Sequence, residues 1–327
     1  LTYSGASVVL GANTLTLSGG GTLSNTNALV LNNADSLLSL SGITALGDID
    51  GTAASSQNKG LSVTASATMG DYDLSAVSYL SIGGAGVTLA GQLNLNPGGE
   101  MITSGEGKYT GDIELAGGTF NSADSLTLDG TVGITADSEI KVADTLTLSQ
   151  AGGLALGANT LTLSGGGSLS SEVMTLNNAN SKILLNGITL NKAVTTANSS
   201  GLDVDANSTV TAFEVGHTTP VSIAQGVTLS GGVDVSAGSI KLNETGTLAS
   251  TLTMAGGTLD MDETATVSGT LTHSADITID VAAGKNLTYS GTAIGVGANT
   301  ITLTGGGTFT SGGIVLNNAA SKLVLNP

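Results

Sequence analysis

The amino-acid sequence repeats itself at long intervals, and this repetition limits the folds open to the chain more than any other feature. The segment GANTLTLSGGGTL at residues 11–23 returns at residues 157–169 with 12 of 13 positions identical and at residues 297–309 with 10 of 13. A second segment follows it at each place, as LVLNNA, MTLNNA and IVLNNA. Such copies are typical of repeat architectures, in which each repeat packs mainly against its neighbours.

The copies divide the chain into two full repeat units and one partial unit. We predict repeat unit 1 at residues 1–145, repeat unit 2 at residues 146–286 and a partial repeat unit 3 at residues 287–327, in one continuous solenoid. Two interpretations of the partial unit stay open: the segment belongs to a longer array, or a shortened last repeat acts as a cap.

Within each unit, short runs alternate apolar and polar residues, such as LTL from Leu15 and VTL from Val87. This period of two places the apolar side chains on one face of a short strand. Between the runs lie Gly-Gly-Gly, Asn-Asn, Asp-Gly and Ser-Gly, which favour tight turns. Strands of three to five residues separated by single turns suit a coil of stacked turns better than a sandwich of long strands.

Composition agrees with such a coil. The apolar fraction is 40% but aromatic residues are only 2%, so the core must be built from Leu, Val, Ile and Ala, while the 49 glycines supply turns. We therefore predict an all-β fold, a parallel β-solenoid (β-helix) of tandem repeats. With about 20 residues per turn, it would have about 16 turns. The aromatic signatures of propellers and barrels and the helical half of leucine-rich repeats are missing.

Charge and cysteine content exclude several functions. All eight basic residues are Lys, and 25 acidic residues give a net charge of −17, which disfavours nucleic acid and anionic lipid as partners. The absence of Cys excludes disulfides and thiolate metal sites. No apolar run is long enough for a transmembrane helix, so we expect no membrane insertion of this segment.

The runs LTLSGGGTL from Leu15, LAGGTF from Leu115 and LTLSGGGSL from Leu161 resemble those of bacterial β-strand-repeat surface proteins. That group includes autotransporter passengers and giant adhesins like filamentous haemagglutinin. The resemblance covers almost the whole chain, although it is a style of strand and turn. It implies a right-handed β-helix, export to the cell surface, a role in adhesion, spacing or fibre formation, and no catalytic residues.

The leading interpretation is therefore a structural or adhesive segment of an extracellular fibre or stalk, and not an enzyme. Its expected partners are further copies of the repeat, in the same chain or through end-to-end association, and a cell-surface or glycan receptor. One alternative is the subunit of a self-assembling filament. A carbohydrate-binding or ice-binding β-solenoid is a further alternative.

Four Asp-x-Asp pairs are the candidates for a metal site, and Ca²⁺ is the one cofactor they suggest. On a strand, residues i and i+2 point to the same side and offer two hard oxygens, while Ca²⁺ takes six to eight. No pair recurs in the other repeat unit, which favours solvated surface charge. The pairs are Asp48 and Asp50, Asp71 and Asp73, Asp203 and Asp205, and Asp260 and Asp262. Asp203, Asp205, Asp260 and Asp262 are retained as weak metal candidates.

Other recurring residues have structural interpretations. His217 and His273 lack partners at ligand spacing and are expected to be exposed or in turns. The triple glycines are interpreted as tight turns, because no GK[ST] follows them. The Asn-Asn pairs are interpreted as turn caps.

Thr-x-Thr pairs recur in all three units, beginning at Thr14, Thr160 and Thr300. A flat Thr ladder on a solenoid resembles an ice-binding face, which needs such pairs on consecutive turns. Strands with Ser, Lys, Asn or Asp interrupt these pairs. We therefore interpret them as strand residues that face water.

Overall fold

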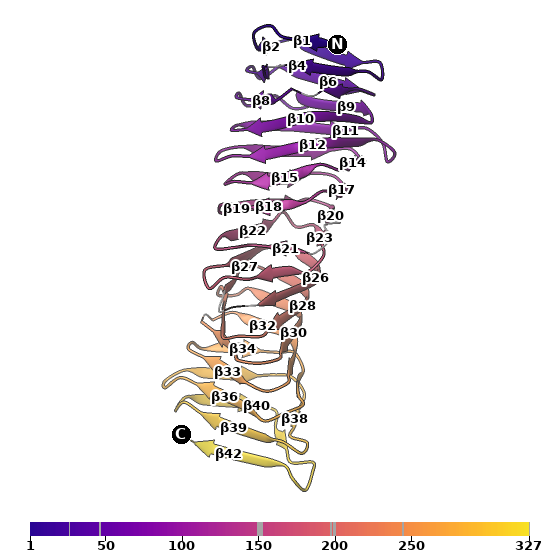
Figure 1. Cartoon of the computed structure of the whole chain (residues 1–327). Coiled ribbons are helices and arrows are strands. Elements are labelled where there is room, and N and C mark those ends of the chain that lie inside the picture. Colours follow the sequence, from indigo (N-terminus) through magenta and orange to yellow (C-terminus); the bar gives the residue numbers. More distant parts are fainter. Residues whose placement is uncertain are drawn as a thin grey trace. The chain divides into compact units, whose positions relative to one another are not determined.

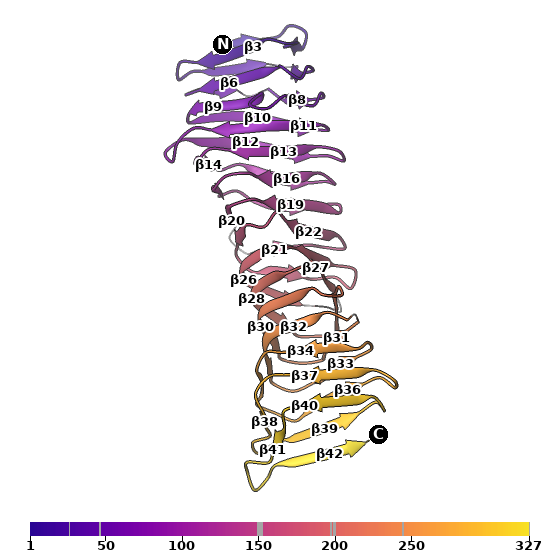
Figure 2. The same ribbon diagram turned by 180° about the vertical axis from the view of Figure 1, so that it is seen from behind.

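The structure is a computed structural model that describes residues 1–25, 27–45, 47–148, 153–196, 198, 201–243 and 245–326. All regular elements are β-strands, with no helix in these ranges. Figures 1 and 2 show that successive turns of the chain place their strands side by side. The predicted all-β parallel β-solenoid is confirmed.

The chain forms two compact units. Compact unit 1 comprises Leu1–Leu154 and Leu161–Glu172, and compact unit 2 comprises Ala155–Thr160 and Val173–Pro327. This division follows contacts in space, whereas the predicted repeat units follow the sequence. The repeat boundaries therefore stay a prediction.

One parallel ladder, the first ladder, has one strand in each turn. Its partners lie between 19 residues apart, as for Leu61 and Leu80, and 24 apart, as for Ile277 and Ile301. Its strands wholly or mostly in compact unit 1 are β3 (Thr14–Ser18), β6 (Leu37–Ser41), β9 (Gly60–Ala65), β11 (Val77–Ile82), β13 (Glu100–Ser104), β16 (Thr119–Ser122), β19 (Ser138–Val142) and β22 (Thr160–Ser164). Those in compact unit 2 are β25 (Lys182–Asn186), β27 (Gly201–Ala206), β29 (Thr219–Ile223), β31 (Ser239–Leu242), β33 (Thr258–Met261), β36 (Ile277–Val281), β39 (Thr300–Thr304) and β42 (Lys322–Asn326). Eight such strands in each unit agree with the predicted total of about 16 turns.

A second ladder contains shorter strands and some that run the length of two. Those that begin in compact unit 1 are β1 (Thr2–Tyr3), β2 (Val8–Val9), β4 (Thr22–Asn25), β5 (Leu29–Leu31), β7 (Thr44–Ala45), β8 (Ile49–Gly51), β10 (Ala67–Leu74), β12 (Thr88–Leu95), β14 (Lys108–Tyr109), β15 (Asp112–Leu115), β17 (Leu126–Leu128), β18 (Val132–Ile134), β20 (Thr145–Leu148), β21 (Leu154–Ala155) and β23 (Ser168–Ser170). Those in compact unit 2 are β24 (Met174–Leu176), β26 (Thr189–Thr196), β28 (Ser208–Val215), β30 (Thr228–Val235), β32 (Thr247–Met254), β34 (Ala265–Val267), β35 (Leu271–His273), β37 (Asn286–Tyr289) and β40 (Thr308–Ser311). Two more strands, β38 (Ile294–Gly295) and β41 (Ile314–Val315), pair separately.

The core consists of stacked columns of aliphatic side chains. In the first ladder, Leu38 pairs with Leu61 and Leu61 with Leu80, and all three side chains are buried. Several of the few aromatic residues fill the same interior. Tyr72 is fully buried, its hydroxyl lies 2.7 Å from Ser78 Oγ, and burial raises its pKa to about 12. A chain without Trp therefore gains its stability from many small contributions, about 1.5–3 kcal/mol for each large buried side chain.

The triple glycines form the tight turns that the sequence predicts. Gly19 and Gly20 both have positive φ, 113° and 69°, as do Gly165 and Gly166 at 108° and 82°. Residues with side chains rarely adopt this region. The third glycine of the middle triple is needed for space, because a Cβ on Gly167 would lie 2.5 Å from the carbonyl oxygen of Asp144.

The inward and outward assignment is testable on β6. Leu40→Ala should cost about 2–5 kcal/mol because it leaves a cavity in a closed aliphatic column. Ser39→Ala, one residue away and on the outer face, should change stability by less than about 0.5 kcal/mol. Thermal unfolding followed by circular dichroism measures both. Equal effects would contradict the assignment.

Candidate functional site

The polar arrangement that recurs most often is a corner where one turn is tied to the next. In the first turn, residues 10–13 lead from β2 into β3. The backbone carbonyl of Leu10 accepts hydrogen bonds from the Asn13 backbone N–H at 3.3 Å and from Asn13 Nδ2 at 2.8 Å. Gly11 between them has φ +57°, which a glycine adopts without strain.

The next turn closes over this corner with three side chains. Asn32 Oδ1 accepts the Gly11 N–H at 3.0 Å, and Ser36 Oγ donates to the Gly11 carbonyl at 2.5 Å. Ser36 Oγ also accepts the backbone N–H of Asn33 at 3.2 Å, and Asn33 Oδ1 accepts the N–H of Asp35 at 3.0 Å. We call this arrangement of Gly, two Asn and Ser the corner clamp. It satisfies both backbone groups of Gly11 from the neighbouring turn.

The corner clamp is present three times with the same partners. Asn177 and Ser181 hold Gly157 at 2.9 and 2.5 Å. Asn317 and Ser321 hold Gly297 at 2.8 and 2.5 Å. The sequence correctly predicted that the Asn pair caps a turn, since Asn33 and its copies Asn178 and Asn318 cap their own loop. The reach of the first Asn into the neighbouring turn was missed, although its near-constant spacing of 20 or 21 residues from the Gly was a signal.

Ion pairs also join neighbouring turns. Lys182 Nζ lies 2.6 Å from Asp203 Oδ2, and Lys108 Nζ lies 2.6 Å from Asp129 Oδ2. Lys285 pairs with Glu263. Each Lys therefore meets a carboxylate about one turn away. Such half-exposed pairs contribute about 0–1 kcal/mol each, so they adjust the register more than they determine stability.

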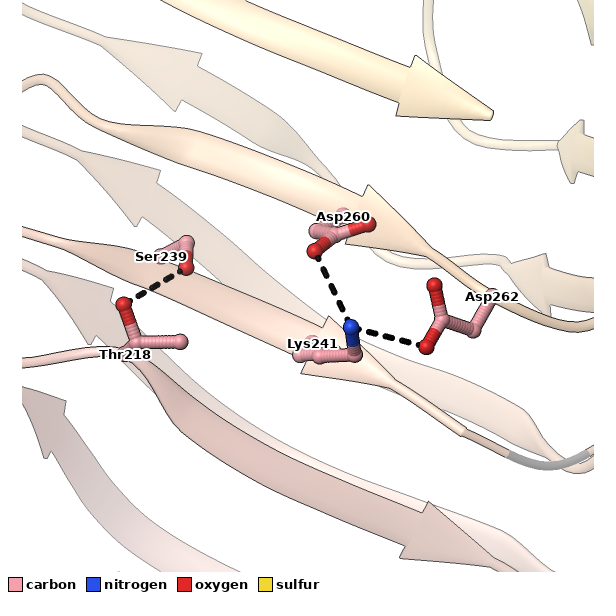
Figure 3. Close-up of polar contacts among 5 residues, drawn as sticks. All are labelled: Thr218, Ser239, Lys241, Asp260 and Asp262. Atoms are coloured by element: carbon pink, nitrogen blue, oxygen red, sulfur yellow. Dashed lines mark hydrogen bonds and ion pairs between the residues drawn. The ribbon is translucent and has the colours of Figure 1, made fainter. Parts of the chain in front are cut away.

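Lys241 on β31 makes the densest of these contacts (Figure 3). Its Nζ lies 2.8 Å from Asp262 Oδ2 and 3.6 Å from Asp260 Oδ2. The hydrogen bond with Asp262, together with the charge of Asp260, raises the pKa of Lys241. Burial raises the pKa of Asp260, and the nearby lysine offsets only part of that effect. Asp280 adds to it from the next turn, where it pairs with Asp260 in the ladder.

The four weak metal candidates do not form a cation site. Asp203 is paired with Lys182, and Asp205 is exposed. Asp260 and Asp262 converge, but on the ammonium group of Lys241, so the space between them does not fit a divalent cation. Across the described ranges, no group of three or more His, Asp or Glu side chains could hold a metal ion.

The other two Asp-x-Asp pairs meet in an acidic region of the second ladder that the sequence did not reveal. Asp50 pairs in register with Asp73, and Asp73 pairs with Asn94. Asn94 Nδ2 donates to Asp73 Oδ1 at 2.7 Å, and Gln92 Nε2 donates to Asn94 Oδ1 at 2.8 Å. Burial raises the pKa of Asp50, and the charges of Asp73 and Asp48 raise it further. Amide side chains thus separate acidic ones, which limits like-charge repulsion along the face.

The threonine pairs do not stack on each other. Thr14 and Thr16 face Leu37 and Ser39 of the next turn, as the interruption in the sequence predicted. A different, single-file column is continuous over five turns of the second ladder. It consists of Thr228, Thr247, Thr266, Thr288 and Thr310. Sequence reasoning missed this column because its members are one turn apart and follow no Thr-x-Thr pattern.

The two histidines lie in separate turns of compact unit 2. The carbonyl of His217 accepts a hydrogen bond from Thr219 Oγ1 at 3.2 Å, and its side chain is exposed. His273 ends β35 and is half-buried, with Nδ1 3.0 Å from the carbonyl oxygen of Ala275. His273 thus stands at a turn as expected.

The corner clamp is testable through its buried serine. Ser181→Ala removes the donor to Gly157 and the acceptor of the Asn178 N–H, and should destabilise by about 1–3 kcal/mol because buried partners lose their bonds. Hydrogen exchange at residues 157–160 should rise. The control Asn180→Ala changes an exposed side chain in the same loop and should leave exchange there unchanged. Identical exchange in both variants would contradict the clamp.

The Lys241 cluster predicts opposite effects for its two acids. The folded state holds the Asp260 proton more tightly than the unfolded chain does, so ionisation of Asp260 lowers stability as pH rises above its usual pKa. Asp260→Asn should therefore unfold at the same or a higher temperature at neutral pH. Asp262→Asn loses the 2.8 Å contact and should be destabilised by up to about 1 kcal/mol.

Thermal unfolding from neutral pH to about pH 3 distinguishes these effects. The difference between Asp260→Asn and the unchanged chain should shrink at the acidic end, where Asp260 is protonated. A larger loss at neutral pH for Asp260→Asn than for Asp262→Asn would refute this account.

Within the described ranges, the chain contains no helix with the length and hydropathy needed to cross a membrane. A scan against protein-family models finds no match, and searches of curated proteins and of solved structures find no significant similarity. The functional argument therefore depends on the geometry of the turns and on the sequence.

Proposed function

We propose that this chain is a structural and adhesive segment of an extracellular fibre or stalk on a bacterial surface. The observation that carries the proposal is the use of its polar side chains. Corner clamps and ion pairs bind each turn to the next, and the acids that looked like ligands pair with lysine. The arrangement favours mechanical continuity over chemistry, and we propose no enzymatic activity and no cofactor.

The outer surface suits exposure to solvent outside the cell. Outward positions carry Thr, Ser, Asn and acidic residues, and the net charge of −17 keeps neighbouring fibres apart. The chain has no Cys, so its folding does not depend on the redox state of the compartment. These features, with the resemblance to surface β-strand repeats, support a cell-surface location and contact with a surface or glycan receptor.

A second candidate, the subunit of a self-assembling filament, has one observation in its favour. Large apolar side chains are exposed in the first turn and in the last turns of the described chain, among them Leu1 and Leu325. Exposed apolar patches mark association sites. In either role, the protein acts by extending a stack of turns.

The cell-surface proposal predicts that the lysines of the protein are accessible on intact cells of the organism that makes it. A membrane-impermeant amine reagent should modify the eight lysines to the same extent before and after lysis. A cytoplasmic protein measured in the same sample provides the control. Modification only after lysis would refute the location.

Adhesion needs a separate test. Beads coated with the folded chain should bind host cells or a glycan array more than beads coated with Leu185→Asp, which places a charge in the closed core. Equal binding by both would remove the adhesive part of the proposal and leave the structural part.

A further inference from the structure

The last strand of the first ladder, β42, is an edge strand whose inward face is open. Leu323 and Leu325 are 37% and 68% exposed. Beside them, Ile279, Leu303 and Phe309 line an open cavity of about 310 Å³. This cavity is the cross-section of the aliphatic core, so the surface has the composition of an interior.

Two other strands of the chain are equivalents of β42. Each follows a corner clamp directly, and the three sequences are LLSLS for β6, KILLN for β25 and KLVLN for β42. The preceding turn holds all three alike, since Leu37, Lys182 and Lys322 donate their backbone N–H to an Asn carbonyl at 3.1 Å. The equivalents of Leu325 are Leu40 and Leu185, and both are 0% exposed. The difference is therefore the covering turn alone.

The covering strand is of the same type in both closed cases. β9 begins Gly-Leu-Ser-Val and covers β6, and β27 begins Gly-Leu-Asp-Val and covers β25. The registers match. Leu38 and Ile183 each pair with the Leu of the covering strand, and Leu40 and Leu185 each pair with its Val.

Backbone contacts fix the same register. The glycine that opens each covering strand donates its N–H to the carbonyl of the clamp serine, Gly60 to Ser36 at 2.9 Å and Gly201 to Ser181 at 3.1 Å. Gly60 has φ +96°, and a Cβ there would lie 2.4 Å from Ser78 Oγ and 2.7 Å from the Tyr79 carbonyl oxygen. A covering strand therefore needs Gly, then Leu, then Val two positions later.

We propose that β42 is the docking edge for a parallel strand of the pattern Gly-Leu-x-Val, supplied by a further turn of this repeat. Its glycine pairs with Lys322 and donates its N–H to the Ser321 carbonyl. Its Leu and Val close over Leu323 and Leu325. The proposal rests on the proposed structural function and specifies the partner at this edge.

A second copy of this chain presents a different edge. Its first ladder begins with β3, which reads Thr-Leu-Thr-Leu-Ser and has no glycine at the required position. The equivalents of β3 are β22 and β39, which pair with β19 and β36, both of the pattern x-Ile-x-Val. The two edges are therefore matched to different strands and not to each other.

The test extends the full chain. In the extended protein, Asn326 is followed directly by a second copy of residues 187–286, so that Gly-Leu-Asp-Val falls after β42 as it does after β25. Hydrogen exchange of the β42 peptide, measured by mass spectrometry, should slow by at least about tenfold. The matched control continues with residues 207–286, which places a different turn on β42, and should give little or no slowing.

Three results would overturn the inference. Slowing by both extensions would mean that the edge accepts any turn, and slowing by neither would mean that it is no docking edge. Protection of β42 in the unextended chain, with the mass of a dimer, would identify a second copy as the occupant. Surface modification of lysines on cells reports on the proposed function separately, so failure of one proposal does not imply failure of the other.

Discussion

The structure depends on the parallel pairing of each strand with its equivalent one turn later. Because side chains alternate along a strand, a slip of one residue between turns would move a whole column such as Leu38, Leu61 and Leu80 from the core to the solvent. The aliphatic column and the backbone ladder therefore enforce the same register. A core of this kind needs no large anchor, since every turn buries a similar set of Leu, Val and Ile against the next.

Register alone does not determine the corners, where turns differ in length. The corner clamp supplies that information by binding both backbone groups of one glycine from the neighbouring turn, as Asn32 and Ser36 do for Gly11. The positive φ of this glycine turns the backbone, and the Asn pair holds the longer loop that follows. The segments GANT and NNA thus recur together because they are two halves of one contact.

The fold could be predicted from the sequence because alternation, turn residues and the count of about 20 residues per turn are local properties. Contacts between turns could not, because they depend on the register. Asp260 and Asp262 have a spacing that suits a metal, and only the ladder shows that Lys241 lies between them. The five-threonine column and the Asp50–Asp73 pairing were missed for the same reason, since their members are about 20 residues apart and no local pattern marks them.

The same register explains why one residue type can belong to a core or to an interface. Leu185 and Leu325 stand at equivalent positions after equivalent clamps, and they differ in exposure from 0% to 68% because one has a covering turn. In a solenoid, the surface between two turns has the same chemistry as a surface between two molecules. Selection of the covering strand then depends on the backbone, where a glycine is required to reach the serine carbonyl, because Leu and Val in the other positions are common to many turns of this chain.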